Sequence, residues 1–256
     1  MVRDRQAGYT VVEVALFMAI TGLMFLIVLL GTGSTIRNVR FTDSNRSFAA
    51  YVQRQYDEII NGLNTRPGLE TCTNGTVTTT SNQTPGTSNC LLMGKLLLFT
   101  LNSGIIRNYP IIGTEPANVD YTQTDQQLVV AFSPSIVTNV GVTTYEIPWG
   151  AVVSGTKRLS DSKAVRALLL VRSPKSSRIL TYSYVPPVTI STSLSDANGV
   201  GVVATTSNSG QTNNFCVKNA DGLGLPAKLV VNNAPTQSAV QIVFDADTSG
   251  SECNGT

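Results

Sequence analysis

The chain contains no histidine among its 256 residues. This absence excludes His-based catalytic triads and any imidazole general base. The GxSxG and HExxH motifs and the Walker phosphate loop are also missing, and no acidic residues cluster as a catalytic pair would. The sequence therefore does not predict an enzyme, and it predicts neither a bound metal nor a cofactor.

Charged residues are also scarce, at 13% of the chain, against roughly 25% in soluble domains. Thr, Ser and Asn take their place, a composition typical of β-rich extracellular domains. The formal net charge is only +2, so global charge predicts neither nucleic-acid binding nor attachment to a membrane surface. The length is sufficient for one or two domains with a sizeable core.

The N-terminal region, by contrast, has a long apolar segment that begins beside an acidic residue. Val14 to Gly31 are eighteen residues without a charge, about the minimum for a helix that spans a bilayer core. Glu13 stands at the edge of this segment. A carboxylate costs roughly 2.5–3.5 kcal/mol at the centre of a membrane helix, and a residue tolerated there usually has a partner. Glu13 is therefore predicted to be functional.

The residues around Glu13 form a recognisable signal. A short charged leader ends in Gly8, an aromatic residue follows at Tyr9, and Glu13 is the fifth residue after the glycine. Ala19 and Gly22 then stand within the apolar segment. This arrangement resembles the N-terminal signal of type IV pilins and type II secretion pseudopilins. The resemblance covers about the first 30 residues.

The resemblance implies a processing step and an assembly contact. A prepilin peptidase would cut between Gly8 and Tyr9 and would methylate the new amine of Tyr9. Glu13 would pair with the Tyr9 amine of a neighbouring subunit in a helical filament. Tyr9 replaces the phenylalanine usual in the family, and no proline lies near Leu30, where main subunits often have one. The second departure favours a minor pilin or a pseudopilin.

Two simpler explanations of the apolar segment stay open. An ordinary secretory signal would be cut after the segment, near Gly31 and Gly33. The segment is longer than the usual apolar core of 7–15 residues, and this explanation leaves Glu13 without a role. A plain single-pass anchor would need no cut. The basic bias of residues 1–8 predicts that this end stays in the cytoplasm.

One long helix is predicted from Tyr9 to about Leu63. After a polar stretch, apolar residues recur at steps of three and four from Phe48 onward, which is typical of an amphipathic helix. Gly31 and Gly33 are predicted weak points where this helix bends or unwinds. The predicted organisation is a leader at 1–8, a transmembrane or filament-core helix at 9–33, an amphipathic half at 34–63, and a head at 64–256 with a sub-boundary near 186.

The head is predicted to be β-rich, with nine or ten strands. Residues 64–90 lack large apolar side chains and are predicted to form a long loop. Later segments are short, apolar or alternating, and bounded by turn residues. The candidate strands are Leu91–Leu101, Ile105–Ile112, Gln127–Phe132, Thr143–Ile147, Ala164–Arg172, Ser177–Val185, Gly201–Thr206, Asn214–Val217, Ala227–Val231 and Val240–Phe244. The predicted fold class is thus α+β, a pilin-like helix followed by a disulfide-stapled head.

Four cysteines lie beyond the apolar segment, in two pairs that are local in sequence. An even number outside a membrane segment indicates disulfides formed in an oxidising compartment. Of the three possible pairings, the local ones are favoured, Cys72 with Cys90 and Cys216 with Cys253. Four buried thiols are the alternative. By resemblance to pilins, the Cys216–Cys253 loop would form an exposed edge used for contacts.

Two further features have a functional interpretation and a simpler one. Asp245 and Asp247 resemble the opening of a calcium loop, but the acid expected at the twelfth position is missing and Glu252 would have to substitute. A polar turn is the simpler interpretation. The window from Lys157 to Arg178 is strongly basic, which would orient subunits or attract DNA. A solvated hairpin is the alternative, and nucleic acid stays undecided as a partner.

The resemblance therefore predicts a filament subunit of a type IV pilus-like machine. Its precursor would cross the cytoplasmic membrane once, with the N-terminus inside, and the assembled form would be an extracellular pilus or pseudopilus. Its partners would be the prepilin peptidase, other pilin subunits and, before assembly, the cytoplasmic membrane. The alternative is a membrane-anchored or secreted adhesive β domain that does not polymerise.

Overall fold

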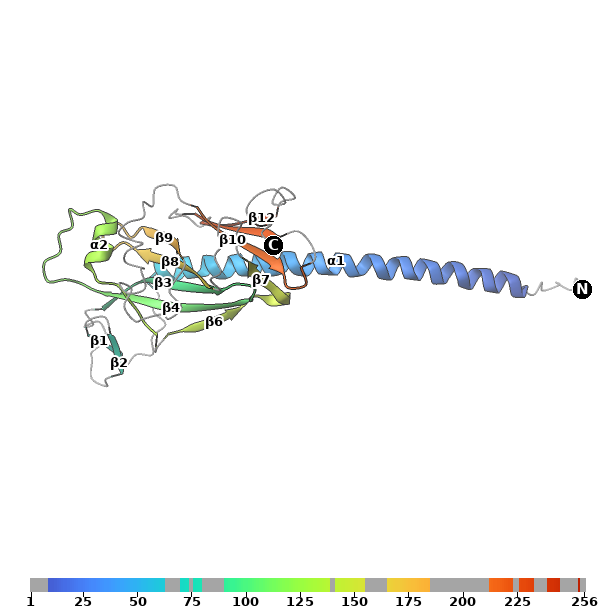
Figure 1. The fold of residues 1–256 in the computed structure, drawn as a ribbon, viewed down its shortest axis with the longest axis horizontal. Helices are drawn as coiled ribbons and strands as arrows, with labels where there is room; N and C mark the ends of the chain where they lie inside the picture. Colours follow the sequence, from blue (N-terminus) through green and yellow to red (C-terminus); the bar gives the residue numbers. More distant parts are fainter. Residues whose placement is uncertain are drawn as a thin grey trace, which may run out of the picture. The chain divides into compact units, whose positions relative to one another are not determined.

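The computed structural model of the protein describes residues 9–62, 70–73, 76–79, 90–138, 141–154, 165–184, 212–222, 226–232, 239–244 and 253. The chain divides into two units, Met1–Asp43 and Ser44–Thr256. The first unit contains the N-terminal part of helix α1, and the second contains the remainder of that helix and every described strand (Figure 1). The domain boundaries predicted at residues 8, 33, 63 and 186 stay predictions.

Helix α1 spans Val11–Ile60, which confirms the single long helix predicted from the apolar and amphipathic segments. It continues through Gly31 and Gly33, so the prediction that these glycines unwind it is wrong. A Cβ atom added at either glycine would meet no neighbouring atom within 4 Å. Close packing against another part of the chain therefore does not explain why glycine stands at these two positions. The helix ends where Gly62 takes a φ of +63°, a conformation that favours glycine.

The remaining elements are mostly strands arranged in three antiparallel sheets. A two-stranded sheet consists of β1 (Glu70–Thr73) and β2 (Thr76–Thr79). A six-stranded sheet has the order β5 (Ser135–Ile136), β4 (Ile105–Thr114), β3 (Cys90–Thr100), β8 (Val165–Arg172), β9 (Ile179–Tyr184), with β6 (Thr143–Glu146) also paired to β4. A four-stranded sheet has the order β12 (Val240–Phe244), β11 (Ala227–Asn232), β10 (Thr212–Asn219), β7 (Ala151–Ser154).

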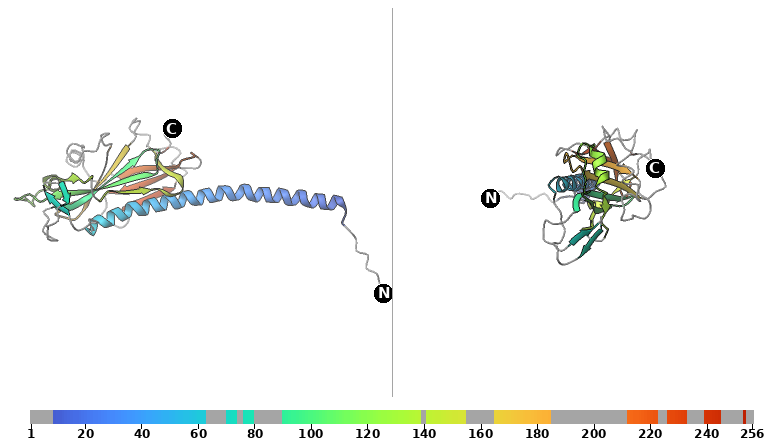
Figure 2. Two further views of the ribbon diagram at one scale, coloured as in Figure 1. Left: turned by 90° about the horizontal axis from the view of Figure 1, so that it is seen from below. Right: turned by 90° about the vertical axis from the view of Figure 1, so that its left-hand side faces the viewer.

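The C-terminal part of α1 packs on one face of the six-stranded sheet (Figure 2). Its buried apolar residues are Phe48, Val52, Tyr56 and Ile59, whose three- and four-residue spacing confirms the predicted amphipathic stripe. On the sheet, successive side chains of β3 alternate between faces. Leu97 and Phe99 therefore join the face that α1 covers.

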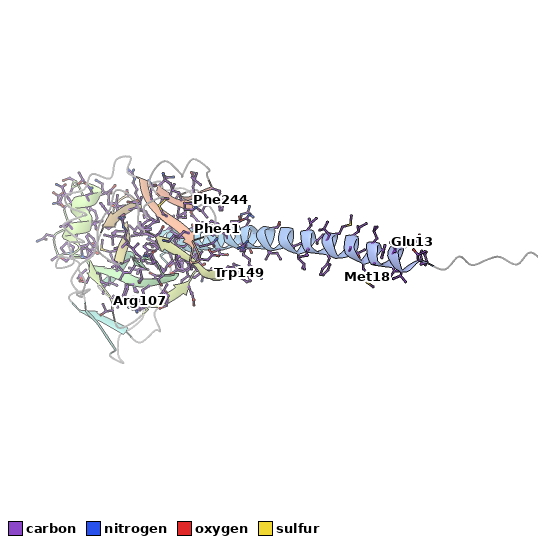
Figure 3. The ribbon with its side chains drawn as sticks, turned by 45° about the vertical axis from the view of Figure 1, so that its right-hand side comes forward. Glu13, Met18, Phe41, Arg107, Trp149 and Phe244 are labelled. Carbon is purple, nitrogen blue, oxygen red and sulfur yellow. A yellow bond between two sulfur atoms is a disulfide. The ribbon has the colours of Figure 1, made fainter. Side chains whose placement is uncertain are left out.

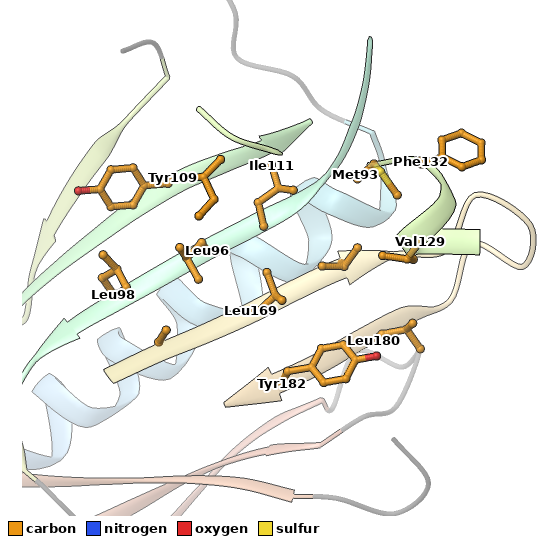
Figure 4. Close-up of a cluster of buried hydrophobic side chains, with 13 residues drawn as sticks. Met93, Leu96, Leu98, Tyr109, Ile111, Val129, Phe132, Leu169, Leu180 and Tyr182 are labelled. Atoms are coloured by element: carbon orange, nitrogen blue, oxygen red, sulfur yellow. The ribbon is translucent and has the colours of Figure 1, made fainter. Parts of the chain in front are cut away.

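The opposite face of the same sheet carries a second apolar cluster (Figure 4). Leu96 and Leu98 of β3 lie there with Tyr109 of β4 and Leu169 of β8. Helix α2 (Asp125–Ala131) closes one end of this cluster through Val129. Because β3 is buried on both faces, its sequence is a nearly continuous apolar run, interrupted by Lys95, rather than an alternating one.

The strand predicted at Gln127–Phe132 is wrong, because this segment forms α2. The apolar run Leu-Val-Val there is as compatible with a short buried helix as with a strand. The hydrogen bonds at the first turn favour the helix over the strand. Thr124 accepts a hydrogen bond from the Gln127 backbone N–H (3.4 Å) and Gln127 Oε1 accepts one from the Thr124 N–H (3.1 Å), a reciprocal capping box.

One other prediction needs correction, and one strand was missed. Residues 64–90 were predicted to be a loop, yet β1 and β2 form a hairpin within them, with Cys72 opposite Val77. Strand β7, Ala151–Ser154, was not predicted at all, because a four-residue apolar segment is too short for a periodic pattern. The described residues contain twelve strands, more than the nine or ten expected. The segments predicted at 201–206 and near 186 lie outside the described residues.

Candidate assembly segment and helix–sheet pocket

The N-terminal part of α1 presents large apolar side chains to its surroundings. Every described residue from Val11 to Leu29 is exposed, including Phe17 (68%) and Leu26 (58%). By length and composition, α1 is the one helix within the described residues that is suited to cross a membrane. A soluble domain normally buries such residues, so this segment is a candidate membrane anchor.

Glu13 lies on the first turn of α1 (Figure 3). Its Oε2 accepts hydrogen bonds from the Thr10 backbone N–H (2.9 Å) and the Thr10 hydroxyl (3.0 Å), while its own backbone N–H donates to Thr10 Oγ1 (3.3 Å). These contacts form a capping box, in which Thr10 and Glu13 satisfy backbone donors that the first helical turn leaves free.

Sequence reasoning missed this local role, although the Thr-x-x-Glu spacing before an apolar run is its signature. Both hydrogen bonds from Thr10 end on the same carboxylate oxygen, Oε2. A carboxylate has two oxygens and about four acceptor positions. Within the described residues, Oε1 of Glu13 therefore keeps its capacity for another donor. Gly8, the predicted cut site, lies outside the described residues, and Tyr9 precedes the helix with an exposed side chain.

One predicted disulfide is present. Cys216 of β10 is bonded to Cys253 across 37 positions of sequence, with their Cα atoms 5.4 Å apart. Both cysteines are buried, so the bond ties the chain near its C-terminus to the four-stranded sheet. The side chains of Cys72 and Cys90 lie outside the described residues, and their pairing stays a prediction.

The other sequence-level candidates are only partly described. Asp245, Asp247 and Glu252 lie outside the described residues. Among the described residues, no three acidic, cysteine or histidine side chains gather where they could hold a metal. In the basic window, Arg172 donates to the Ser177 hydroxyl (2.9 Å) and Lys175 to the Gln123 carbonyl (3.3 Å).

A pocket of about 680 Å³ lies between the C-terminal part of α1 and the six-stranded sheet; we call it the helix–sheet pocket. Its lining includes Tyr51, Gln55 and Glu58 of α1, Lys95 of β3, Asn108 of β4 and Tyr145 of β6. No sequence pattern indicated this site, because its members are brought together from four elements.

A network of polar side chains forms the floor of the helix–sheet pocket. The Lys95 ammonium donates to Gln55 Oε1 (2.7 Å) and is paired with the Glu58 carboxylate, and Asn108 Nδ2 also donates to Gln55 Oε1 (2.8 Å). Lys95, Gln55 and Asn108 are buried. Burial of a charge is tolerated when a counter-ion and hydrogen bonds accompany it, and Glu58 supplies that counter-ion.

The wall of the pocket contains two stacked tyrosine rings. Tyr51 and Tyr145 have ring centroids 4.0 Å apart and planes inclined by only 6°. Burial raises the pKa of Tyr51 to about 12, although the nearby side chains of Thr143 and Asn108 act in the opposite direction. The Tyr51 hydroxyl thus stays protonated at neutral pH. It makes no hydrogen bond of normal geometry within the described residues.

The Glu58 carboxylate is expected to make the stability of the protein fall in acid. Partial burial alone would raise its pKa, but the hydrogen bonds and charges of Lys95 and Arg54 outweigh burial and lower that pKa below 4.5. A carboxylate with a depressed folded-state pKa stabilises the fold above its unfolded value, and this contribution is lost as the pH falls through the folded value. Urea unfolding between about pH 5 and pH 3 measures this loss.

The matched variants for this measurement are Glu58→Gln and Asp57→Asn. Glu58→Gln should flatten the decline in unfolding free energy, because the group that binds the extra proton is gone. Asp57 carries an exposed carboxylate one position earlier on the same helix, so Asp57→Asn should keep the wild-type decline. Equal slopes for Glu58→Gln and wild type would show that the Lys95–Glu58 pair does not contribute.

Comparisons with protein-family models, with curated proteins and with solved structures find no match to this chain.

Proposed function

We propose that the protein is a filament subunit, a minor pilin or pseudopilin, of a type IV pilus-like machine. The observation that carries this proposal is an exposed apolar helix with a single carboxylate in its first turn. The subunit is made as a precursor in the cytoplasmic membrane, cut between Gly8 and Tyr9, methylated at Tyr9, and assembled through α1. Its β-rich head then belongs to an extracellular pilus or pseudopilus.

The exposed helix needs two apolar environments at different times. Burying a large apolar side chain stabilises by about 1.5–3 kcal/mol relative to leaving it in water, and residues from Val11 to Leu29 offer many such side chains. The bilayer can cover them before assembly. Neighbouring copies of the same helix can cover them afterwards, so transfer between the two environments exposes little apolar surface to water.

Glu13 supports the proposal through its unused oxygen. Within an apolar bundle a carboxylate needs a nearby cation. Cleavage after Gly8 would free the amine of Tyr9, and a neighbouring subunit could place that amine at Oε1 while Thr10 holds Oε2. The pairing would fix how far each helix is shifted along the next.

The alternative, an anchored adhesive β domain that does not polymerise, also has an observation in its favour. The capping box gives Glu13 a purely local partner in Thr10, and a helix cap needs no second subunit. An anchor would then keep its apolar helix in the bilayer permanently. The two functions differ in what happens to the N-terminus and in how they respond to substitution of Glu13.

The N-terminus of the native protein tests the proposed function. Mass spectrometry of protein purified from its own cells should find a chain that starts at methylated Tyr9. The variant Gly8→Leu should stay uncut, because a side chain at this position blocks access of the peptidase to the backbone, and it should be absent from sheared filaments. An intact Met1, or a start near Ser34, would refute the proposal.

A further inference from the structure

We propose that the helix–sheet pocket of one copy of this protein receives Trp149 of a second copy, so that the β-rich units associate through two different surfaces. The inference rests on the proposed function for its purpose, which is to connect neighbouring heads in a filament. Its test does not rest on that function, because the side chain and the pocket both belong to the second unit, Ser44–Thr256. Every copy therefore carries both halves of the contact.

Trp149 is the one tryptophan of the chain, and it is 58% exposed. It lies at the edge of the second unit (Figure 3) and does not line the pocket of its own copy. Tryptophan is enriched among the residues that contribute most binding energy at protein interfaces. Its burial removes about 150–250 Å² from water, so Trp149 is a candidate anchor for a partner.

The backbone holds Trp149 in a fixed and strained position. The residue has a φ of 60° and a ψ of 24°, a left-handed conformation that a bulky side chain rarely adopts. On one side, the Ile147 N–H donates to the Gly104 carbonyl (2.9 Å). On the other side, the Ala220 N–H donates to the Gly150 carbonyl (3.0 Å). Strain of this kind is often retained at binding sites, and an anchor that is already ordered loses less entropy when it binds.

The helix–sheet pocket offers what an indole ring needs. Its volume of about 680 Å³ lies within the range of small-molecule sites, about 300–1,000 Å³. Ala50, Leu92 and Pro110 are among the residues that line it and supply apolar contact. The indole N–H can only donate a hydrogen bond, and the lining contains acceptors in the Glu58 carboxylate and the Thr144 hydroxyl.

The charges beside the two surfaces are complementary. Arg54 lines the pocket with a side chain that is 76% exposed. Near Trp149, the acidic residues Glu146 and Asp221 are both exposed. Arg54 can therefore meet a carboxylate of the second copy, and its guanidinium can also stack on the face of the indole ring. The attraction between exposed charges should weaken at high salt.

A contact between Trp149 and the pocket joins two unlike surfaces of the same chain. When two copies associate in this way, one pocket and one tryptophan stay unused at the ends of the pair. Such a contact continues into a ring or an open chain instead of stopping at a dimer. Continued association is what a filament subunit needs, whereas an anchored domain that does not polymerise has no use for it.

The test uses the full chain in detergent micelles, where the single tryptophan reports its own burial. As the protein concentration rises, the fluorescence emission of Trp149 should shift to shorter wavelength, and sedimentation should show association in parallel. Trp149→Ala should weaken the association by about thirtyfold or more, as for an interface hot spot. Ala50→Glu adds bulk and negative charge at an exposed lining position and should abolish the shift in emission. Circular dichroism checks that each variant is folded.

A mixture of the two variants separates this contact from any other. Trp149→Ala keeps an open pocket and Ala50→Glu keeps the tryptophan, so the mixture should form dimers and no larger species, although neither variant associates alone. The emission of Trp149 in the second variant should shift only in the mixture. Tyr121→Ala is the matched control, because Tyr121 is an exposed aromatic residue outside the pocket lining, and it should associate as the wild type does.

An emission that does not move with concentration would overturn the proposal. Association that survives both Trp149→Ala and Ala50→Glu would overturn it as well, because the copies would then meet elsewhere, for example through their apolar helices inside one micelle. These measurements need no cleaved N-terminus. Their failure would therefore refute this contact and leave the proposed function to the test at Tyr9.

Discussion

Replacing Glu13 by glutamine is expected to abolish filament assembly while the helix still starts at Val11. Glutamine at this position can accept the hydrogen bond from the Thr10 N–H as glutamate does. It cannot attract the positive amine of Tyr9 on a neighbouring subunit. Leaving that amine without its counter-ion in an apolar bundle costs about 3–5 kcal/mol per contact, so the yield of sheared filaments should fall by more than about tenfold. Immunoblots of the membrane fraction should show normal insertion.

Thr10→Ala is the matched control for the local role of Glu13. It removes the Thr10 hydroxyl, which accepts from the Glu13 N–H and donates to Oε2, but leaves the carboxylate in place. The loss of the cap should cost about 0.5–2 kcal/mol of helix stability, and filaments should still form. Normal assembly of Glu13→Gln combined with failure of Thr10→Ala would show that Glu13 acts only as a helix cap.

The long helix and several strands of the sheets could be predicted because their sequence signals are long and local. The apolar segment and the amphipathic stripe after it specify α1, and the runs at Leu91–Leu101 and Ile105–Ile112 became β3 and β4 with small shifts in their ends. The Cys216–Cys253 bond also followed from local pairing. For the helix and these strands, one segment contains the whole signal.

The errors concern short segments, where tertiary context decides the structure. Leu128 and Val129 would suit a strand equally well, and only the reciprocal bonds of Thr124 and Gln127 mark a helix start there. Strand β7 is held by its pairing with β10, Val153 opposite Val217. The partner strand β10 is about 60 positions away in the chain, so no local sequence pattern predicts the pairing.

The helix–sheet pocket could not be predicted for the same reason. Its floor depends on Gln55 accepting from both Lys95 and Asn108, residues separated by 40 and 53 positions of sequence from Gln55. In the sequence, Lys95 interrupts an apolar strand, and no local pattern indicates that Gln55 and Glu58 contact its ammonium group. The assembly segment differs, because Glu13 and the apolar run that follows it are adjacent in the chain.

Phe99→Ala is expected to have the largest effect on the stability of the second unit. Phe99 is fully buried on the α1 face of β3. Its ring lies edge-to-face with Phe48 of α1 at 6.1 Å and against Phe215 of β10 at 4.7 Å. One side chain thus joins the helix to both larger sheets. Truncation of a buried phenylalanine costs about 3–5 kcal/mol through lost burial and the cavity left behind.

This loss should appear as a lower midpoint of thermal unfolding, by roughly 6–20 °C for a unit of this size, measured by circular dichroism of the full chain in detergent. Phe244→Ala is the matched control, since Phe244 of β12 is 48% exposed and its truncation should cost less than about 1 kcal/mol. If both variants unfold at the same temperature, Phe99 does not join α1 to the two sheets. A selective loss in Phe99→Ala would show that the C-terminal part of α1 is an integral part of the folded head, because Phe99 contacts the helix through Phe48.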